Sequence, residues 1–288
     1  MKLALGTVQF GLNYGIANKQ GQVSHEEAQS ILDHARASGM DTLDTAIAYG
    51  DSERRLGEIG IRDWQVISKL PAIPESCTDV TAWVRESVFS SLERLRIPKL
   101  RGLLLHRSQE LVGPQGDALY RALIAFKDQG KVEKIGVSIY GPDELDTLWP
   151  HYQLDLVQAP FNVVDHRFAT SGWLARLHQA GTEIHIRSVF LQGLLLMEPA
   201  RRPETFNRWQ PLWDKWQHWL DDQSLTPLQA CLGFVLTQPE IDRVVVGVDS
   251  RKQLEEILSA AKTMGVSVSQ SFATEDLLLI NPSNWVKQ

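Results

Sequence analysis

The sequence predicts an α/β protein, namely an eight-stranded parallel (β/α)8 TIM barrel that forms a single domain over residues 1–288. Short apolar runs alternate along the chain with longer amphipathic stretches, and this pattern requires a parallel sheet. Eight such runs fit into the 288 residues, a usual length for one barrel, and no linker interrupts them. An open doubly wound sheet is less favoured because the segment LGTVQFG at residues 5–11 lacks the GxGxxG pattern.

The predicted strands are short and apolar, and most of them are closed by a polar residue, as buried parallel strands often are. They cover residues 2–5, 42–44, 65–69, 103–106, 134–138, 154–158, 183–187 and 243–246. The carboxyl ends of barrel strands meet at one face, so we expect the closing residues to surround a common mouth.

Helices are predicted between these strands. They include residues 25–38, 79–95, 119–129, 143–148, 172–180 and 251–262. Three of these helices are followed by a glycine, which is a frequent helix C-terminal signal: Gly39, Gly130 and Gly181.

The longest connection runs from residue 191 to about residue 226 and carries Trp209, Trp213, Trp216 and Trp219. Tryptophans three and four residues apart share one face of a helix, so we expect a helix that packs this stripe onto the barrel. A wall of the substrate pocket is the alternative. The tail over residues 270–288 contains a short predicted helix at 276–280 that caps the barrel or borders its mouth.

The composition argues against several classes of protein. No run approaches the roughly 18 apolar residues of a membrane span, and residues 1–9 lack the features of a signal peptide, so a cytoplasmic protein is expected. A net charge of −6 without basic runs offers no surface for nucleic acid. The two cysteines, Cys77 and Cys231, have no CxxC spacing and indicate neither a disulfide framework nor a zinc site.

Polar residues stand at the ends of strands two to seven, where a barrel builds its active site. They are Asp44, Lys69, His106, Ser138, Gln158 and Arg187, with Tyr49 on the loop after Asp44. Residues two positions earlier on each strand are expected to fill the barrel interior. Each polar residue alone has a structural explanation, such as a turn cap or a core histidine. Their occurrence together at successive strand ends favours a catalytic cluster.

Four of these residues, Asp44, Tyr49, Lys69 and His106, are suited to the reduction of a carbonyl group. That reaction needs a hydride, which only a cofactor can deliver, and a proton, which a side chain can supply. We expect the Lys69 ammonium to lower the pKa of the Tyr49 phenol and make it an efficient donor. Asp44 would keep Lys69 charged in a buried site, and His106 would orient the carbonyl oxygen.

The motifs around these residues resemble those of the aldo-keto reductases. The segment GMDTLDTA at residues 39–46, followed by Tyr49-Gly50, Glu53 and Leu56-Gly57, is similar to the signature of that family. The similarity continues in family order over nearly the whole chain. It runs through SK at 68–69, LLHR at 104–107, GKVEKIGVS at 130–138, QAPFN at 158–162 and QGLL at 192–195.

This resemblance implies an NAD(P)H-dependent oxidoreductase that reduces an aldehyde or ketone to an alcohol, with Asp44, Tyr49, Lys69 and His106 as a catalytic tetrad. Hydride would come from the nicotinamide and the proton from Tyr49. The implied cofactor is NADPH, held without a Rossmann domain. The implied cofactor-binding residues are Gly6, Thr7, Asp44, Ser138, Gln158, Arg187, Ser188, Phe190, Gln192, Gly193, Gly247, Gln253 and Glu256.

The resemblance also implies a place for each part of the dinucleotide. Gly6 and Thr7 would lie near the nicotinamide ribose, and Ser138 and Gln158 would hold the carboxamide. The loop at 188–193 would hold the pyrophosphate, and residues 247–256 the adenosine end.

Two positions near the nicotinamide depart from the family pattern. Arg187 stands where an aromatic residue commonly stacks on the nicotinamide ring, and a planar guanidinium can also stack on a ring face. Ile139 replaces the asparagine that commonly follows Ser138, which removes one hydrogen-bonding group.

Two further departures concern the 2′-phosphate of NADP. Gly247 and Gln253 replace a lysine and an arginine that are common at these positions. Arg251 and Lys252 are the remaining cations nearby in the sequence, so NADH is an alternative cofactor.

Two other functions stay open at this point. A cofactor-binding sensor would keep the fold and the pocket but act through a protein partner. A lyase would use Lys69 to form a Schiff base with its substrate. Both would be soluble barrels with the same strand-end residues.

No metal site is predicted. Glu183 and His185 alternate with isoleucines on the seventh strand and are expected to form a structural hydrogen-bonded pair beneath Arg187. The expected partner is a small-molecule carbonyl compound. Residues 165–167, together with the tryptophan helix, are expected to shape a pocket for a polar or sugar-like compound of this class. Neither nucleic acid nor membrane is an expected partner, and the chain is expected to be a monomer or a weak homo-oligomer.

Overall fold

The computed structural model describes residues 1–263, 266 and 268–285 and contains a closed barrel of eight parallel strands in sequential order. The predicted (β/α)8 TIM barrel is therefore confirmed. Its strands are β1 (Leu3–Gly6), β2 (Thr42–Asp44), β3 (Gln65–Leu70), β4 (Leu100–Leu105), β5 (Val132–Ser138), β6 (Leu156–Pro160), β7 (Glu183–Arg187) and β8 (Arg243–Gly247). The barrel closes where β1 pairs with β8, from Leu3 opposite Val244 to Gly6 opposite Gly247.

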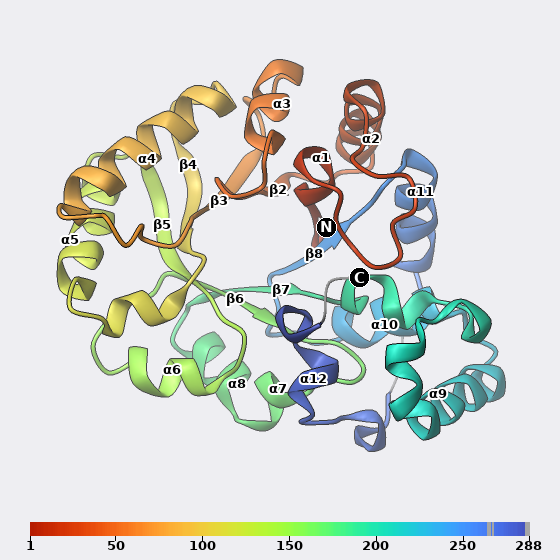
Figure 1. Cartoon of the computed structure of the whole chain (residues 1–288). Coiled ribbons are helices and arrows are strands. Elements are labelled where there is room, and N and C mark those ends of the chain that lie inside the picture. Colours follow the sequence, from red (N-terminus) through yellow and green to blue (C-terminus); the bar gives the residue numbers. More distant parts are fainter. Residues whose placement is uncertain (264–265, 267, 286–288) are drawn as a thin grey trace.

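The described residues form twelve α-helices, most of which surround the barrel on its outside (Figure 1). They are α1 (Val8–Gly11), α2 (His25–Ala37), α3 (Ser52–Ile59), α4 (Val80–Leu95), α5 (Gly116–Asp128), α6 (Asp143–Leu148), α7 (Arg167–Thr170), α8 (Trp173–Gln179), α9 (Gln210–Gln223), α10 (Pro227–Leu236), α11 (Arg251–Ala260) and α12 (Leu277–Ile280). None of the helices in this described part of the chain is long and apolar enough to cross a membrane.

Local sequence signals set several helix ends. The Ser24 and Asp79 side chains accept hydrogen bonds from the first turns of α2 and α4, and Thr226 with Gln229 forms a capping box at α10. The three predicted glycine stops all have positive φ angles, at Gly39 (84°), Gly130 (68°) and Gly181 (74°). Their left-handed conformation ends the helices, as predicted.

Five predicted strand ends are corrected, and three of them, on β1, β3 and β8, move by one residue to Gly6, Leu70 and Gly247. His106 is not part of β4, which ends at Leu105, although the His106 amide still donates to the Leu70 carbonyl at 3.1 Å. Gln158 lies in the middle of β6 and not at its end, because pairing with β7 continues until Pro160 lies opposite Arg187. Proline has no amide hydrogen to donate and is uncommon inside strands. The sequence therefore suggested that the strand ends before Pro160.

The barrel interior contains Ile67, Leu104 and Leu156, which form a cluster of their own, separate from the main core. Each lies two residues before a polar residue of the mouth, namely Lys69, His106 and Gln158. The prediction that these positions fill the interior is confirmed for these strands. The apolar cluster forms a floor beneath the polar mouth.

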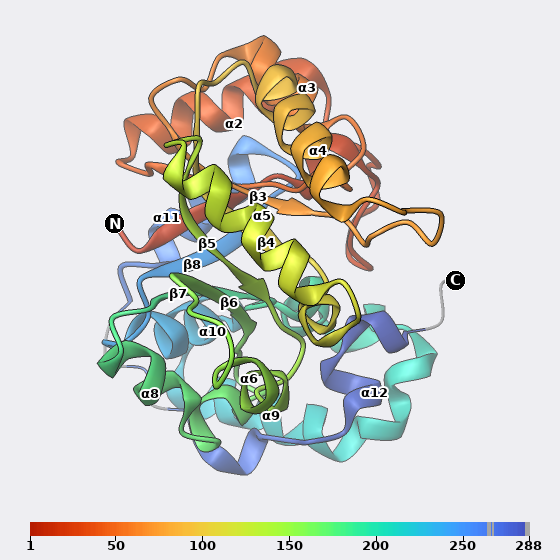
Figure 2. The same ribbon diagram turned by 90° about the vertical axis from the view of Figure 1, so that its left-hand side faces the viewer.

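The tryptophan stripe belongs to α9 and the turn before it. Trp213 and Trp216 are buried, Trp216 stacks on Trp219 at 5.4 Å, and both of these rings pack edge-on against Phe272. Trp209 Nε1 donates to Asp276 Oδ2 (3.0 Å), which joins this segment to the tail near α12 (Figure 2). The predicted helix with a packed tryptophan stripe is present, but the prediction that the stripe packs onto the barrel is corrected, because Trp216 and Trp219 pack against Phe272 of the tail.

Candidate active site

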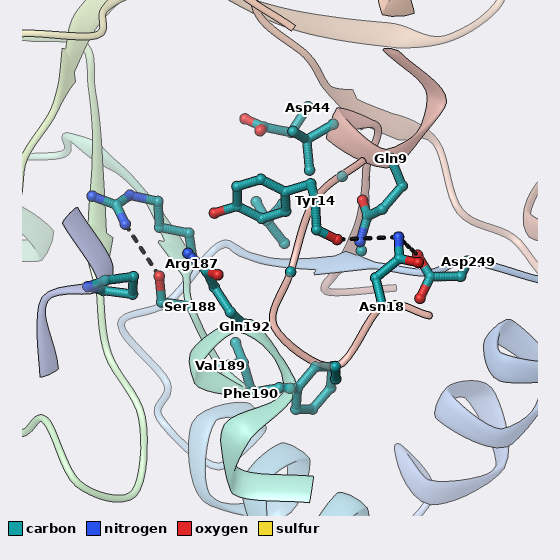
Figure 3. A pocket seen from close by; sticks show the side chains of 18 of the residues that line it. Gln9, Tyr14, Asn18, Asp44, Arg187, Ser188, Val189, Phe190, Gln192 and Asp249 are labelled. Carbon is teal, nitrogen blue, oxygen red and sulfur yellow. Dashed lines mark hydrogen bonds between the residues drawn. The ribbon is translucent and has the colours of Figure 1, made fainter. Parts of the chain in front are cut away.

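A cavity of about 630 Å³ lies at the carboxyl ends of the strands. Its lining contains all thirteen predicted cofactor-binding residues, from the β1 end to α11: Gly6, Thr7, Asp44, Ser138, Gln158, Arg187, Ser188, Phe190, Gln192, Gly193, Gly247, Gln253 and Glu256. Tyr49 and His106 line the same cavity. Figure 3 shows Asp44 and Tyr14 between Arg187 on one side and Asp249 on the other.

Asp44 and Lys69 form a buried ion pair behind the cavity wall. Lys69, only 1% exposed, has its Nζ 2.6 Å from Asp44 Oδ1 and also donates to the Thr45 carbonyl at 3.0 Å. Gln158 Nε2 donates to the other carboxylate oxygen at 2.7 Å. Burial lowers the pKa of Lys69, and the Asp44 charge acts in the opposite direction. The pair therefore fixes one carboxylate and one ammonium in a defined geometry.

Tyr49 lies next to this pair and to His106. The Lys69 Nζ is 5.2 Å from the centre of the Tyr49 ring, and the Tyr49 and His106 rings meet edge-on at 5.8 Å. The expected lowering of the Tyr49 pKa is wrong for this structure: burial raises that pKa, and the Asp44 charge raises it further. The positive charge of Arg187 acts in the opposite direction but does not outweigh burial and Asp44.

His106 is held in its neutral form. Burial lowers its pKa to about 4, and the positive charges of Lys69 and Arg187 act in the same direction. A neutral imidazole has one N–H to donate and one nitrogen to accept. At neutral pH, His106 can therefore offer a single hydrogen bond to an oxygen in the cavity.

Two glycines allow the Tyr49 loop to pack closely against α1. A Cβ atom at Gly11 would lie 1.7 Å from the Tyr49 carbonyl oxygen and 2.6 Å from the Ser52 amide nitrogen. Gly50 has a φ of 51° and would place a Cβ 2.5 Å from the Gly11 carbonyl oxygen. No side chain fits at either position without moving the backbone, so the two glycines define where Tyr49 stands.

A buried carboxylate anchors α3 beside the ion pair. Glu53 is 1% exposed, and its Oε1 accepts from Ser68 Oγ (2.7 Å) and Ser91 Oγ (2.6 Å). Its Oε2 accepts two hydrogen bonds from Arg94, at 2.9 and 2.6 Å. Because Ser68 precedes Lys69, this network ties α3 and α4 to the strand that carries the lysine.

Arg187 is fixed at the mouth by its neighbours. Its Nη2 donates to the Ile139 carbonyl at 2.9 Å, its Nη1 donates to Ser188 Oγ at 3.1 Å, and its guanidinium lies 4.8 Å from the centre of the Tyr140 ring. This arrangement holds the guanidinium plane in place against a ring face.

The loop after β7 has an uncommon backbone. Ser188, Leu191 and Gln192 have φ angles of 60°, 48° and 55°, and Gly193 follows with 90°. Left-handed residues other than glycine cost about 1–3 kcal/mol each and gather at ligand clamps. Together with the lining residues, this loop fits the nicotinamide dinucleotide that the family resemblance implies.

Several lining residues were not predicted from the sequence. They are Gln9, Tyr14, Asn18, Tyr140 and Asp249, all from loops or helix starts at the mouth, and Pro282 with Ser283 from the tail. The tail therefore borders the mouth, one of its two expected positions. Tyr140 and Asp249 lie two residues after Ser138 and Gly247, the last residues of β5 and β8. This position just beyond a strand end could have predicted that both side chains line the cavity.

Residues 165–167 do not shape the cavity as expected. Asp165 and His166 are buried, and His166 stacks on Phe234 at 4.8 Å. Arg167 makes an ion pair with Asp165, with 2.9 Å between Nη2 and Oδ2. Asp165 and Arg167 satisfy each other, and His166 packs on α10 through Phe234, so these side chains stabilise the fold beside the site.

Glu183 and His185 form the predicted structural pair, with His185 Nε2 and Glu183 Oε1 2.7 Å apart. Burial raises the pKa of Glu183, but hydrogen bonds from His185 and Lys134 outweigh it and lower that pKa to about 2. Over residues 1–263, 266 and 268–285, no group of three or more His, Cys, Asp or Glu side chains is arranged to hold a metal ion.

Comparisons with known proteins agree with the architecture. Residues 2–274 match the model of the Aldo/keto reductase family. A curated relative, the aldo-keto reductase str7 of Strobilurus tenacellus, is 27% identical over 83% of this chain and 77% of the relative.

Two solved structures share the fold. An aldo-keto reductase of Bacillus halodurans in its holo form superposes with a TM-score of 0.76 at 18% identity, over 99% of this chain and 95% of the other. A glycerol dehydrogenase of Gluconobacter oxydans superposes with a TM-score of 0.70 at 20% identity, over 94% and 88% of the two chains.

Proposed function

We propose that this chain, which belongs to the aldo/keto reductase family, is an NAD(P)H-dependent oxidoreductase that reduces an aldehyde or ketone to an alcohol. The observation that carries the proposal is the buried Asp44–Lys69 ion pair beside Tyr49 and His106, both of which line the cavity. Family membership supports the use of a nicotinamide cofactor, and the thirteen lining residues at the expected positions support where it binds.

A bound nicotinamide cofactor would supply the hydride to the carbonyl carbon. The proposed role of Tyr49 is to give its phenolic proton to the carbonyl oxygen as the negative charge develops there. Burial raises the pKa of Tyr49, so the phenol holds its proton until the reaction generates a base beside it. The nearby Lys69 ammonium would stabilise the phenolate that remains.

The other three residues are proposed to set the geometry and charge of this step. Asp44 keeps Lys69 in place through the 2.6 Å ion pair. Neutral His106 would donate its N–H to the carbonyl oxygen and direct that oxygen toward Tyr49. A Schiff-base role for Lys69 is not supported, because its Nζ faces Asp44 and Thr45 and the side chain is 1% exposed.

The experiment that tests the proposal measures oxidation of NADPH and NADH by the purified protein with a panel of small aldehydes and ketones. Loss of absorbance at the nicotinamide band that depends on both protein and carbonyl compound supports it. Detection of the alcohol product excludes a cofactor side reaction. Tight cofactor binding without turnover of any compound would instead favour the sensor alternative.

The rate of reduction is expected to be nearly independent of pH between about pH 5.5 and 9. The pKa of His106 is depressed to about 4, so this group is protonated only below that range. The pKa of Tyr49 is raised above its ordinary value of 10.0, so this group loses its proton only above the range. The measurement is kcat/KM for carbonyl reduction across this range, corrected for cofactor decay in blanks without protein.

An acid limb with an apparent pKa near 6.5 would contradict the neutral state of His106, since that value is its ordinary pKa. An alkaline fall well below pH 10 would show that the working complex lowers the pKa of Tyr49, as the sequence had led us to expect.

A further inference from the structure

The end of the cavity next to α11 is lined with hydrogen-bond acceptors. Asp249, in the loop between β8 and α11, and Glu256, on α11, both line the cavity. Figure 3 shows Asp249 beside Gln9 and Asn18, on the opposite side of the cavity from Arg187 and Ser188. We call Gln9, Asp249 and Glu256 the acceptor cluster.

Asp249 is half-buried, with the amide side chains of Asn18 and Gln253 beside it. Its Oδ1 accepts one hydrogen bond, from Asn18 Nδ2 at 3.2 Å. Burial raises the pKa of Asp249, because the ionised carboxylate has lost part of its water, and a hydrogen bond with the Gln253 side chain only partly offsets this rise. A ligand that brings hydroxyl donors to this carboxylate would replace the lost water.

Gln9 occupies the space above Gly247. A Cβ at Gly247 would lie 2.6 Å from Gln9 Nε2 and 2.8 Å from Gln9 Oε1, so the amide fills the place where a side chain at 247 would begin. Gln9 Oε1 is buried without a hydrogen-bond partner among the described residues. The Gln9 amide thus places a hydrogen-bond acceptor in the space that a lysine side chain at position 247 would enter.

The cations of α11 near this end do not line the cavity. Arg187 is the one lysine or arginine among the described residues that line the cavity, and it lies at the far side, bonded to Ile139 and Ser188. Arg251 Nε pairs with Glu255 Oε1 at 2.9 Å on the exposed face of α11. Arg251 and Lys252 are both exposed, and both lie outside the cavity lining.

The two nicotinamide cofactors differ only at the adenosine ribose. NAD(H) has a 2′-hydroxyl there, which can donate a hydrogen bond, whereas NADP(H) has a phosphate that accepts hydrogen bonds and carries negative charge. In dinucleotide sites generally, an acidic residue suits the first and an arginine suits the second. We propose that the acceptor cluster makes this protein selective for NAD(H), with Asp249 as the specificity-determining residue. This inference rests on the proposed function, because it specifies the cofactor of that same site.

The test is calorimetric binding of NAD⁺ and NADP⁺, with 5′-AMP and adenosine 2′,5′-bisphosphate as fragments that contain only the adenosine end. NAD⁺ is expected to bind at least about 10-fold more tightly than NADP⁺. Likewise, 5′-AMP is expected to bind more tightly than adenosine 2′,5′-bisphosphate. Asp249→Asn keeps the size of the side chain and removes its charge, so it should bring the two dissociation constants closer together. Asp128→Asn, an exposed carboxylate at the end of α5, is the matched control and should leave the ratio unchanged.

The binding results distinguish a failure of this inference from a failure of the proposed function. NADP⁺ binding as tightly as NAD⁺ or more tightly in the unmodified protein would overturn the inference but leave the proposed function intact. A ratio that is the same in Asp249→Asn and in the unmodified protein would overturn the role of Asp249. Failure of both dinucleotides to bind would overturn the proposed function and this inference together.

Discussion

Replacing Tyr49 by phenylalanine is expected to lower kcat/KM for carbonyl reduction by about 10³-fold, within the range of a positioned general acid. The change removes one oxygen and keeps the ring, so its edge-on contact with His106 at 5.8 Å should survive. Affinity for the nicotinamide cofactor should stay within a few-fold of that of the unmodified protein. Steady-state kinetics with a reactive aldehyde, together with a cofactor titration, measure both quantities.

A second phenol in the cavity makes this test specific. Tyr14 also lines the site, and burial raises its pKa as well. If Tyr14→Phe abolished turnover and Tyr49→Phe spared it, the proton donor would be Tyr14 and the assignment made here would be wrong. Tyr120→Phe serves as the remote control, because the Tyr120 hydroxyl bonds the Gln153 carbonyl on the surface.

Replacing Lys69 by methionine is expected to lower the free energy of unfolding by about 3–5 kcal/mol, the usual cost of removing one partner of a buried ion pair. Asp44 is 5% exposed and would keep its hydrogen bond from Gln158 but lose its counter-charge. Activity should fall as well, since the phenolate would lose the nearby cation. Urea denaturation followed by circular dichroism measures the stability change.

The chain contains a control with the same separation of charges. Lys99 Nζ is 2.6 Å from Glu133 Oε1, as Lys69 Nζ is from Asp44 Oδ1, but that pair is solvent-exposed. Lys99→Met should therefore cost about 0–1 kcal/mol. The double change Asp44→Asn with Lys69→Met should regain part of the stability without regaining activity. Equal costs for the two single lysine changes would show that burial does not govern the Asp44–Lys69 pair.

The sequence was sufficient for the barrel and for most of the site because both depend on buried parallel strands. Such strands are short apolar runs, and the polar residue that closes a run must find partners at the mouth. Lys69 after Val66-Ile67-Ser68 is an example, since it pairs with Asp44 on the neighbouring strand. Gln158 was placed at the mouth correctly even though β6 continues two residues beyond it.

What the sequence did not predict depends on loop paths and on burial. Gln9, Tyr14 and Asp249 come from segments whose course no periodicity fixes, so their meeting at one end of the cavity is visible only in three dimensions. The direction of the Tyr49 pKa shift depends on how deeply the phenol is buried and on the nearby Asp44 charge, and the residue spacing does not encode that burial.

Gly11 and the Tyr49 backbone lie so close together that only a glycine, which has a hydrogen atom in place of a side chain, fits at position 11. The residue at position 11 therefore affects where the Tyr49 hydroxyl lies. Gly11 contributes nothing to the wall of the cavity, yet a Cβ there would need the space of the Tyr49 carbonyl oxygen, 1.7 Å away. In a library of random variants, we therefore expect substitutions at residue 11 to abolish activity as substitutions at residue 49 do, although residue 11 does not contact the substrate or the cofactor. Positions at which substitution abolishes activity will thus include α1 as well as the residues that line the cavity.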